Sequence, residues 1–220
     1  MLLITPETRI ADTVIAHPEI ITVLNRFGID LGLGDNTLAG LCRATDVNPE
    51  FLASILNTFL NRDYFPESRL RSFDISLIVR YLMMANNSYA HFHLPTIERH
   101  FGMMLAKDNG VNNNLALMFG FFKELQAEIA GRIEDDSRLL AETKPLSHSQ
   151  VQAMHNADAL IEDKLLDLLT MMVKHLSGDY DRRLCQAVIM GIVGLRHDVV
   201  NNNRLRVRLL YPSIQAQSKI

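Results

Sequence analysis

Apolar residues recur every three or four positions along most of this 220-residue chain, a spacing that predicts helices rather than strands. In the first part of the chain the helical segments are short, and proline, glycine and capping residues separate them. The expected helices cover residues 8–16, 19–27 and 37–44 and a segment that starts at Pro49. Together they predict a small helical module over residues 1–62.

The expected helices of the second part are much longer, and each carries apolar positions near one face. They cover about residues 74–104, 115–142, 150–176 and 180–210. Short connections between long helices are typical of an up-down-up-down four-helix bundle. The sequence therefore predicts an all-α protein in which a polar linker at 63–73 joins the module to a bundle over 74–220. Pro95 is expected to kink the first long helix, and Tyr211-Pro212 to close the last.

Composition supports a sizeable core, since 48% of the residues are hydrophobic. Charged residues make up 21% and the formal net charge is −3, which gives no electrostatic footprint for nucleic acid or an anionic membrane. No apolar run approaches the roughly 20 residues that a membrane helix needs. The two cysteines lie far apart and the first residues lack a signal-peptide pattern, so a cytoplasmic location is expected.

Near the C-terminus, His197 and Asn201 lie four residues apart and should share a helix face. A histidine followed one turn later by a carboxylate is a common metal-binding pair in helical bundles, whereas an amide is a poor ligand for a transition metal. The chain has no glycine-rich phosphate loop, no GxSxG motif and no CxxC pair. These observations favour a non-enzymatic role.

Charged clusters elsewhere have simpler explanations. The acidic runs 134–136 and 162–163 are expected to be solvated helix faces rather than acid–base pairs. Arg204, Arg206 and Arg208 make the end of the last helix basic. We expect this end to be a solvated helix terminus, with a contact to a partner or to nucleic acid as the alternative.

Two parts of the chain resemble the iron–sulfur cluster repair proteins, a family that carries a hemerythrin-like di-iron bundle. Residues 26–38, RFGIDLGLGDNTL, are similar to that family's N-terminal module, whose pattern is roughly RYGIDFCCGGxxTL. In the bundle, Leu94-Pro95, residues 161–165 (IEDKL) and the helix that contains His197 also match. The order of module, linker and bundle is the family's as well, so the resemblance covers nearly the whole chain.

The resemblance implies a di-iron site, but other residues stand at most of its positions here. The family's adjacent cysteine pair falls at Gly32 and Leu33, so that thiol chemistry is absent. A further family histidine is expected near Val111. The remaining ligand positions fall on Asn86, Arg132, Asp136, Asp158, His197 and Asn201.

One imidazole and two carboxylates are too few ligands for two irons, and a guanidinium beside them would repel a dication. We therefore expect Arg132 to replace the metal as a buried cation that bridges Asp136 and Asp158. Asn86 and Asn201 are expected to complete this polar network.

If a metal does bind, the candidate ligands are His197, Asp136 and Asp158. A displaced mononuclear site would instead combine His93, His155 or His197 with Asp158 and would need several waters.

The predicted function is that of a hemerythrin-like relative of the repair proteins with a degraded di-iron site and no cofactor. It would have a non-enzymatic, regulatory or protein-binding role in stress response. The alternative is a functional metal-binding protein, with di-iron or one other metal, in cluster repair or in sensing of O2 or NO. A protein partner is expected and a homodimer is left open, whereas neither a membrane nor nucleic acid is an expected partner.

Overall fold

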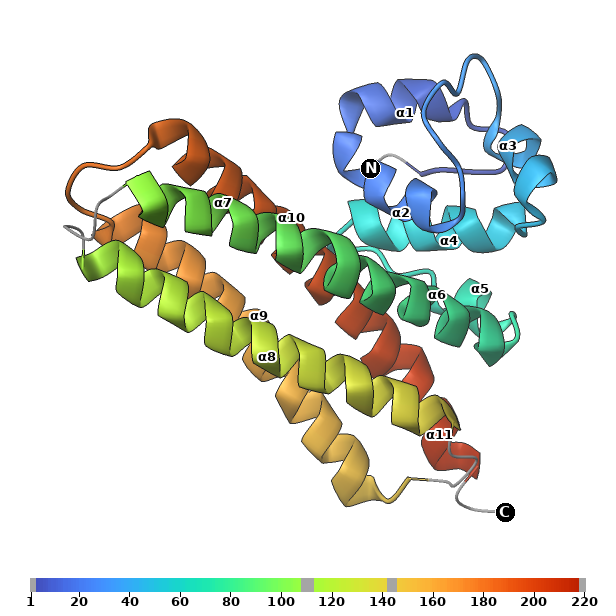
Figure 1. Cartoon of the computed structure of the whole chain (residues 1–220). Coiled ribbons are helices and arrows are strands. Elements are labelled where there is room, and N and C mark those ends of the chain that lie inside the picture. Colours follow the sequence, from blue (N-terminus) through green and yellow to red (C-terminus); the bar gives the residue numbers. More distant parts are fainter. Residues whose placement is uncertain (1–2, 108–112, 142–145, 218–220) are drawn as a thin grey trace. The chain divides into compact units, whose positions relative to one another are not determined.

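The computed structural model describes residues 3–107, 113–141 and 146–217. These residues form α-helices with one short 3-10 segment and two π-helical segments, and they contain no β-strand (Figure 1). The prediction of an all-α protein is confirmed. None of the described helices is both long enough and apolar enough to cross a membrane.

The chain divides into two compact units. Unit 1 consists of Met1–Tyr81 together with Arg208–Leu210, and unit 2 consists of Leu82–Val207 and Tyr211–Ile220. The segment expected to be a linker, 63–73, contains a short helix and belongs to unit 1.

Unit 1 is built from short helices whose starts follow from their capping residues. Thr37 accepts a hydrogen bond from the Gly40 N–H (3.2 Å), and Asn48 accepts from Glu50 and Phe51, as expected for N-caps. The elements are α1 (Ile10–Ala16), the 3-10 segment η1 (Pro18–Ile20), α2 (Ile21–Arg26), α3 (Leu38–Thr45), α4 (Pro49–Leu60) and α5 (Glu67–Arg71).

Two features fix the connections of unit 1. Gly28 has a φ of +70°, the left-handed conformation in which glycine commonly ends a helix. The buried amide of Asn57 on α4 bonds both backbone groups of Ile4, donating to its carbonyl (2.7 Å) and accepting from its N–H (2.8 Å). The segment that contains Ile4 is therefore fastened to α4, most of whose residues are buried.

The long helices form unit 2, with α6 beginning in unit 1. As predicted, Asp74 caps the first of them by accepting from the Ser76 N–H (2.8 Å). The elements are α6 (Ile75–Ser88), η2 (Tyr89–His93), α7 (Leu94–Lys107), α8 (Asn113–Ala141), α9 (His148–His175), α10 (Arg182–Leu205), η3 (Arg206–Leu210) and α11 (Tyr211–Gln217).

Each proline inside a long helix follows a five-residue π-helical segment, in which the N–H of one residue bonds the carbonyl five residues earlier. The segment η2 ends two residues before Pro95, and η3 ends two residues before Pro212. Proline lacks the N–H that an α-helix needs and crowds the preceding turn, so the turn widens there. The expected closure of the last helix at Tyr211-Pro212 is wrong, because the helix continues as α11.

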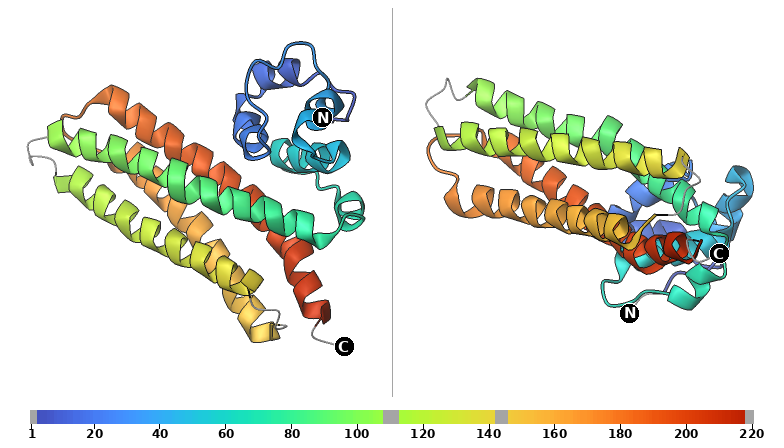
Figure 2. Two further views of the ribbon diagram at one scale, coloured as in Figure 1. Left: turned by 45° about the vertical axis from the view of Figure 1, so that its right-hand side comes forward. Right: turned by 90° about the horizontal axis from the view of Figure 1, so that it is seen from below.

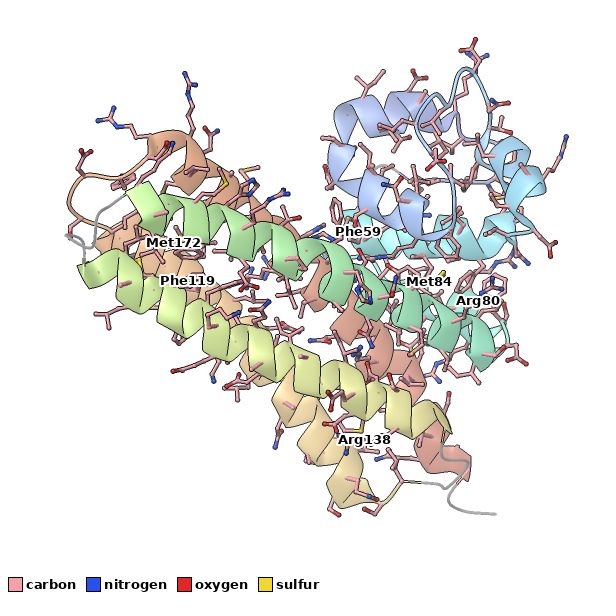
Figure 3. All side chains as sticks on the ribbon, viewed as in Figure 1. Phe59, Arg80, Met84, Phe119, Arg138 and Met172 are labelled. Atoms are coloured by element: carbon pink, nitrogen blue, oxygen red, sulfur yellow. The ribbon has the colours of Figure 1, made fainter. Side chains whose placement is uncertain are left out.

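The helices of unit 2 form a bundle in which consecutive helices run in alternating directions (Figures 1 and 2). Helix α7 packs on α8, α8 on α9, α9 on α10, and α10 closes the ring on α7. Figure 3 shows Phe119 and Met172 near one end of this bundle and Arg138 near the other end of α8.

Gly191 of α10 faces Ile97 of α7. A Cβ atom at this position would lie 2.8 Å from Cγ1 of the buried Ile97. That distance is below van der Waals contact, so the packing of α10 on α7 depends on the absence of a side chain at 191.

Candidate functional site

The polar site lies at the end of the unit 2 core where apolar stripes change to charged and amide side chains. In α8 the buried positions follow a spacing of three and four that ends on Arg132 and Asp136. In α9 the same spacing runs through Asp158, and in α10 it passes Asn202 and reaches Arg206 in η3. None of these five residues is more than 7% exposed. Because they occupy core positions of their helices, the backbone directs them into the bundle.

Arg132 lies at the centre of the site. Its Nε–H donates to Oδ1 of Asp158 (2.7 Å), one Nη donates to Oδ1 of Asp136, and the other donates to the Tyr211 hydroxyl (2.9 Å). The guanidinium therefore bridges two carboxylates that come from different helices, which is the arrangement expected from the sequence.

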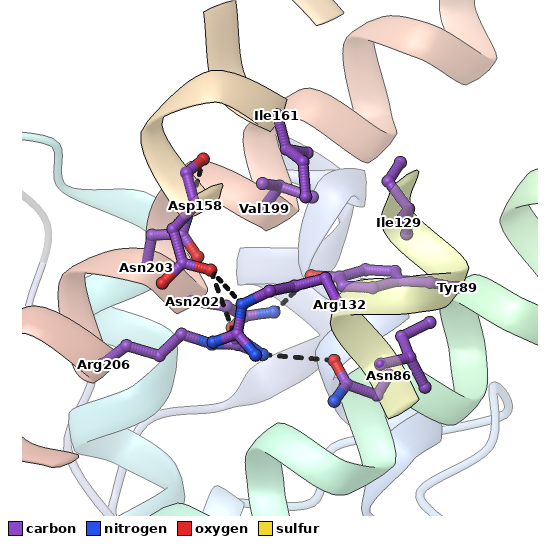
Figure 4. A pocket seen from close by; sticks show the side chains of 11 residues that line it. Asn86, Tyr89, Ile129, Arg132, Asp158, Ile161, Val199, Asn202, Asn203 and Arg206 are labelled. Atoms are coloured by element: carbon purple, nitrogen blue, oxygen red, sulfur yellow. Dashed lines mark hydrogen bonds and ion pairs between the residues drawn. The ribbon is translucent and has the colours of Figure 1, made fainter. Parts of the chain in front are cut away.

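A second guanidinium, that of Arg206, completes the charge balance. Its Nη2 donates to Oδ2 of Asp136 (2.5 Å). Nη2 also donates to Oδ1 of Asn86 (3.2 Å), and Nη1 lies 3.8 Å from Oδ1 of Asp158 (Figure 4). Asn86 in turn donates to Oδ2 of Asp136 (2.7 Å). We call Arg132, Arg206, Asp136 and Asp158 the ion-pair quartet.

The quartet pairs two positive charges with two negative charges. Burial disfavours the charged form of Arg132, but the charges of Asp158 and Asp136 more than offset this, and its pKa is raised. Each of the four carboxylate oxygens accepts at least one hydrogen bond from a described side chain, since Tyr211 donates to Oδ2 of Asp158. Buried charges are tolerated when they are satisfied in this way.

Tyr211 reaches the site because of η3. Arg206 and Tyr211 are five residues apart, and in a regular α-helix they would point about 140° apart. The π-helical turn, in which the Tyr211 N–H bonds the Arg206 carbonyl, brings both onto the same side. Burial and the charge of Asp158 raise the pKa of Tyr211, so its hydroxyl stays protonated and can donate to that carboxylate.

A small cavity adjoins the quartet (Figure 4). Its volume is about 20 Å³, counted as space for the centre of a water molecule. Asn86, Arg132, Asp158, Asn203 and Arg206 line it together with Asn202 and Tyr89, and the isoleucines of α8 and α9 and Val199 cover its apolar side. Asn202 donates to the Tyr89 hydroxyl and to Asp198 (3.3 Å), which forms a second buried polar cluster.

Other candidate residues lie away from the quartet. Asn201 donates to the His197 carbonyl (2.9 Å), lies 3.3 Å from the His197 Nε2 and accepts from Arg204 (2.9 Å), and among the described residues neither Asn201 nor His197 lines the cavity. Asn202, one position further along, takes the inward position expected of Asn201. His93 packs edge-on against Tyr89, whereas His155 is exposed and lies near Gln152 (3.5 Å).

Arg206 was expected at a solvated helix end, and this expectation is wrong because the side chain is only 5% exposed. The signal was present: Leu195, Val199, Asn202 and Arg206 continue one stripe with a spacing of four, three and four. Tyr211 carried no such signal, because regular helix geometry does not predict its direction.

The acidic run of α8 divides as its helical spacing requires. Asp136 points into the core, whereas Glu134 and Asp135 are exposed and lie 3.6 and 3.5 Å from Arg138. Glu162 of α9 is partly buried and accepts from Asn203 (2.8 Å), and burial raises its pKa. The expectation of solvated faces therefore holds for Glu134 and Asp135, whereas Asp136 takes the buried position expected for a partner of Arg132.

The donor set of the site does not fit a di-iron centre. The carboxylates of Asp136 and Asp158 are bonded to two guanidiniums, and no described group of three or more His, Cys, Asp and Glu side chains is placed to hold a metal ion. The position near Val111, where a further family histidine was expected, lies outside the described residues, and the sequence has no histidine between His100 and His148.

Comparisons with known proteins add no family to this picture. No family model matches the chain, and neither a curated protein nor a solved structure matches it. The reading of the site therefore depends on its own geometry.

Proposed function

We propose that the chain is a hemerythrin-like bundle protein in which the ion-pair quartet replaces a metal centre, and that it acts by binding a protein partner rather than by catalysis. The observation that carries the proposal is the pairing of Asp136 and Asp158 with Arg132 and Arg206. A cation that displaced either guanidinium would leave a buried positive charge without its partner, which is strongly unfavourable.

The outer surface of unit 2 supports a binding role. Large apolar side chains on four different elements are more than 60% exposed: Phe92, Leu117, Val173 and Met190. Exposed side chains of this size can be buried when a protein partner packs against them. The setting of such a role in stress response, and the kinship with the cluster repair proteins, come from the resemblance alone.

Iron content tests the proposal. Protein expressed in iron-rich medium and purified without oxygen is expected to be colourless and to contain far less than one iron per chain. The matched control is the Asp136→Asn/Asp158→Asn variant, whose iron content should be equally low. Stoichiometric iron in the wild type that falls in this variant, with absorption typical of an oxo-bridged ferric pair, would support a functional metal protein instead.

The binding role is tested with the chain itself as the first partner. Sedimentation equilibrium at increasing concentration measures self-association, and Leu117→Ser/Val173→Ser should weaken any dimer that buries these two side chains. A monomer at all concentrations would direct the search to a different protein.

A further inference from the structure

Two buried polar atoms beside the cavity have no hydrogen-bond partner among the described residues. One is the donor Nε of Arg206 and the other is the acceptor Oδ1 of Asn202. The two residues are 4% and 2% exposed, and both line the cavity. Buried donors and acceptors are nearly always paired in folded proteins, so this combination points to a molecule that bonds both.

The orientation of the Asn202 amide is set by its neighbours. Its Nδ2 donates to Oδ1 of Asp198 (3.3 Å) and to the Tyr89 hydroxyl. A flipped amide would place its oxygen against the Asp198 carboxylate, where two acceptors would repel each other. The oxygen is therefore the group left to accept a hydrogen bond from a ligand.

Size and charge restrict what the ligand is. A volume of about 20 Å³, counted as space for the centre of a water molecule, is enough to hold water beside the two atoms. The quartet is already balanced, so an added anion or cation would be a buried charge without a partner. A neutral molecule with one acceptor for Arg206 and one donor for Asn202 remains.

We propose that this cavity is a specific site for one ordered water molecule, which accepts from Arg206 Nε–H and donates to Asn202 Oδ1. The water joins the ion-pair quartet to the second cluster formed by Asn202, Tyr89 and Asp198. The polar interior of unit 2 then becomes one continuous hydrogen-bonded network that spans α6 to η3. The inference is independent of the proposed binding role.

The test uses the wild-type protein. A crystal structure should show a density peak within hydrogen-bond distance of both atoms, and NMR should show a cross-peak between water and the Arg206 Nε–H that indicates a long-lived contact. Crystals under xenon pressure test whether the cavity is instead dry, because xenon occupies dry apolar cavities. Xenon in the cavity, or absence of both the peak and the water contact, would overturn the proposal.

Two variants separate this site from general hydration. Asn202→Leu removes the acceptor, and the water contact of Arg206 Nε–H should be lost. Ile129→Val enlarges the apolar wall without removing a polar group, and the contact should persist. Equal loss in both variants would also contradict the assignment.

Discussion

Replacing Arg206 with methionine is expected to destabilise unit 2 severely. The substitution leaves Arg132 as the one guanidinium of the quartet, facing the two carboxylates of Asp136 and Asp158. Asp136 is 4% exposed, so bulk solvent does not reach the carboxylate to replace the lost donor. Breaking a buried pair by removing one partner costs about 3–5 kcal/mol, which is a large part of the stability of an ordinary domain.

The matched control is Arg204→Met, two residues earlier in the same chain segment. Arg204 is only partly buried and donates to the amide oxygen of Asn201 (2.9 Å). Its replacement should cost at most about 1 kcal/mol. The difference between the free energies of unfolding of the two variants separates the effect of the buried charge from the effect of losing any arginine side chain.

A second substitution tests the cause. Asp136→Asn in the Arg206→Met background leaves Arg132 paired with Asp158 and restores the charge balance. The double variant should be more stable than the sum of the single losses predicts, with a coupling of about 1–3 kcal/mol. Urea denaturation followed by circular dichroism measures the free energies of unfolding.

Hydrogen exchange of α8 peptides assigns the loss to unit 2, which matters because the chain has two compact units. The reasoning is refuted if Arg206→Met and Arg204→Met cost the same, or if the double variant shows no coupling.

Three further predictions concern packing, pH and thiol chemistry. Gly191→Ala should lower the free energy of unfolding by about 1–3 kcal/mol, because the added Cβ meets Ile97. Gly194→Ala, whose added Cβ has nothing within 4 Å, should raise it by up to about 1 kcal/mol in the same denaturation assay. Equal effects of the two substitutions would contradict the close contact between Gly191 and Ile97. The pKa of Tyr211 is raised in the folded protein, so its contribution to stability is complete below the ordinary tyrosine pKa of about 10 and declines as the pH rises further. The difference in free energy of unfolding between wild type and Tyr211→Phe should therefore shrink in alkaline solution. A difference that stays constant would argue against a buried phenol. Burial raises the pKa of both Cys42 and Cys185, so both thiols should react with a disulfide reagent slowly in the native protein and rapidly in denaturant; fast native reaction would show that these thiols are accessible.

Much of the fold could be predicted from the sequence because residues next to each helix end determine where the helix begins and ends. Thr37, Asn48 and Asp74 each accept hydrogen bonds from backbone N–H groups within the next three residues. The spacing of apolar residues within each long helix predicts which of its faces is buried. The division of the chain at Tyr81 was not predictable in this way, because it depends on contacts between distant segments.

The site was predictable as far as its residues lie on regular helices. Arg132 and Asp136 are four apart on one face, so their pairing could be read from α8 alone. The choice of Asn201 over Asn202 followed from counting from His197, whereas counting along the apolar stripe from Val199 leads to Asn202. The direction of Tyr211 depends on a turn of different pitch that no local pattern indicates.

The widened turn of η3 has a consequence for how chains of this kind diverge. It contains one residue more than an α-helical path over the same rise would need. Deleting one residue from 207–210 would leave a regular α-helix over the same rise and would place the phenol four positions after Arg206, about 40° away around the helix axis, so the same face of α11 would still meet the core. Natural variants are therefore expected to gain or lose the extra residue of this turn while they keep the phenol and the direction in which it points.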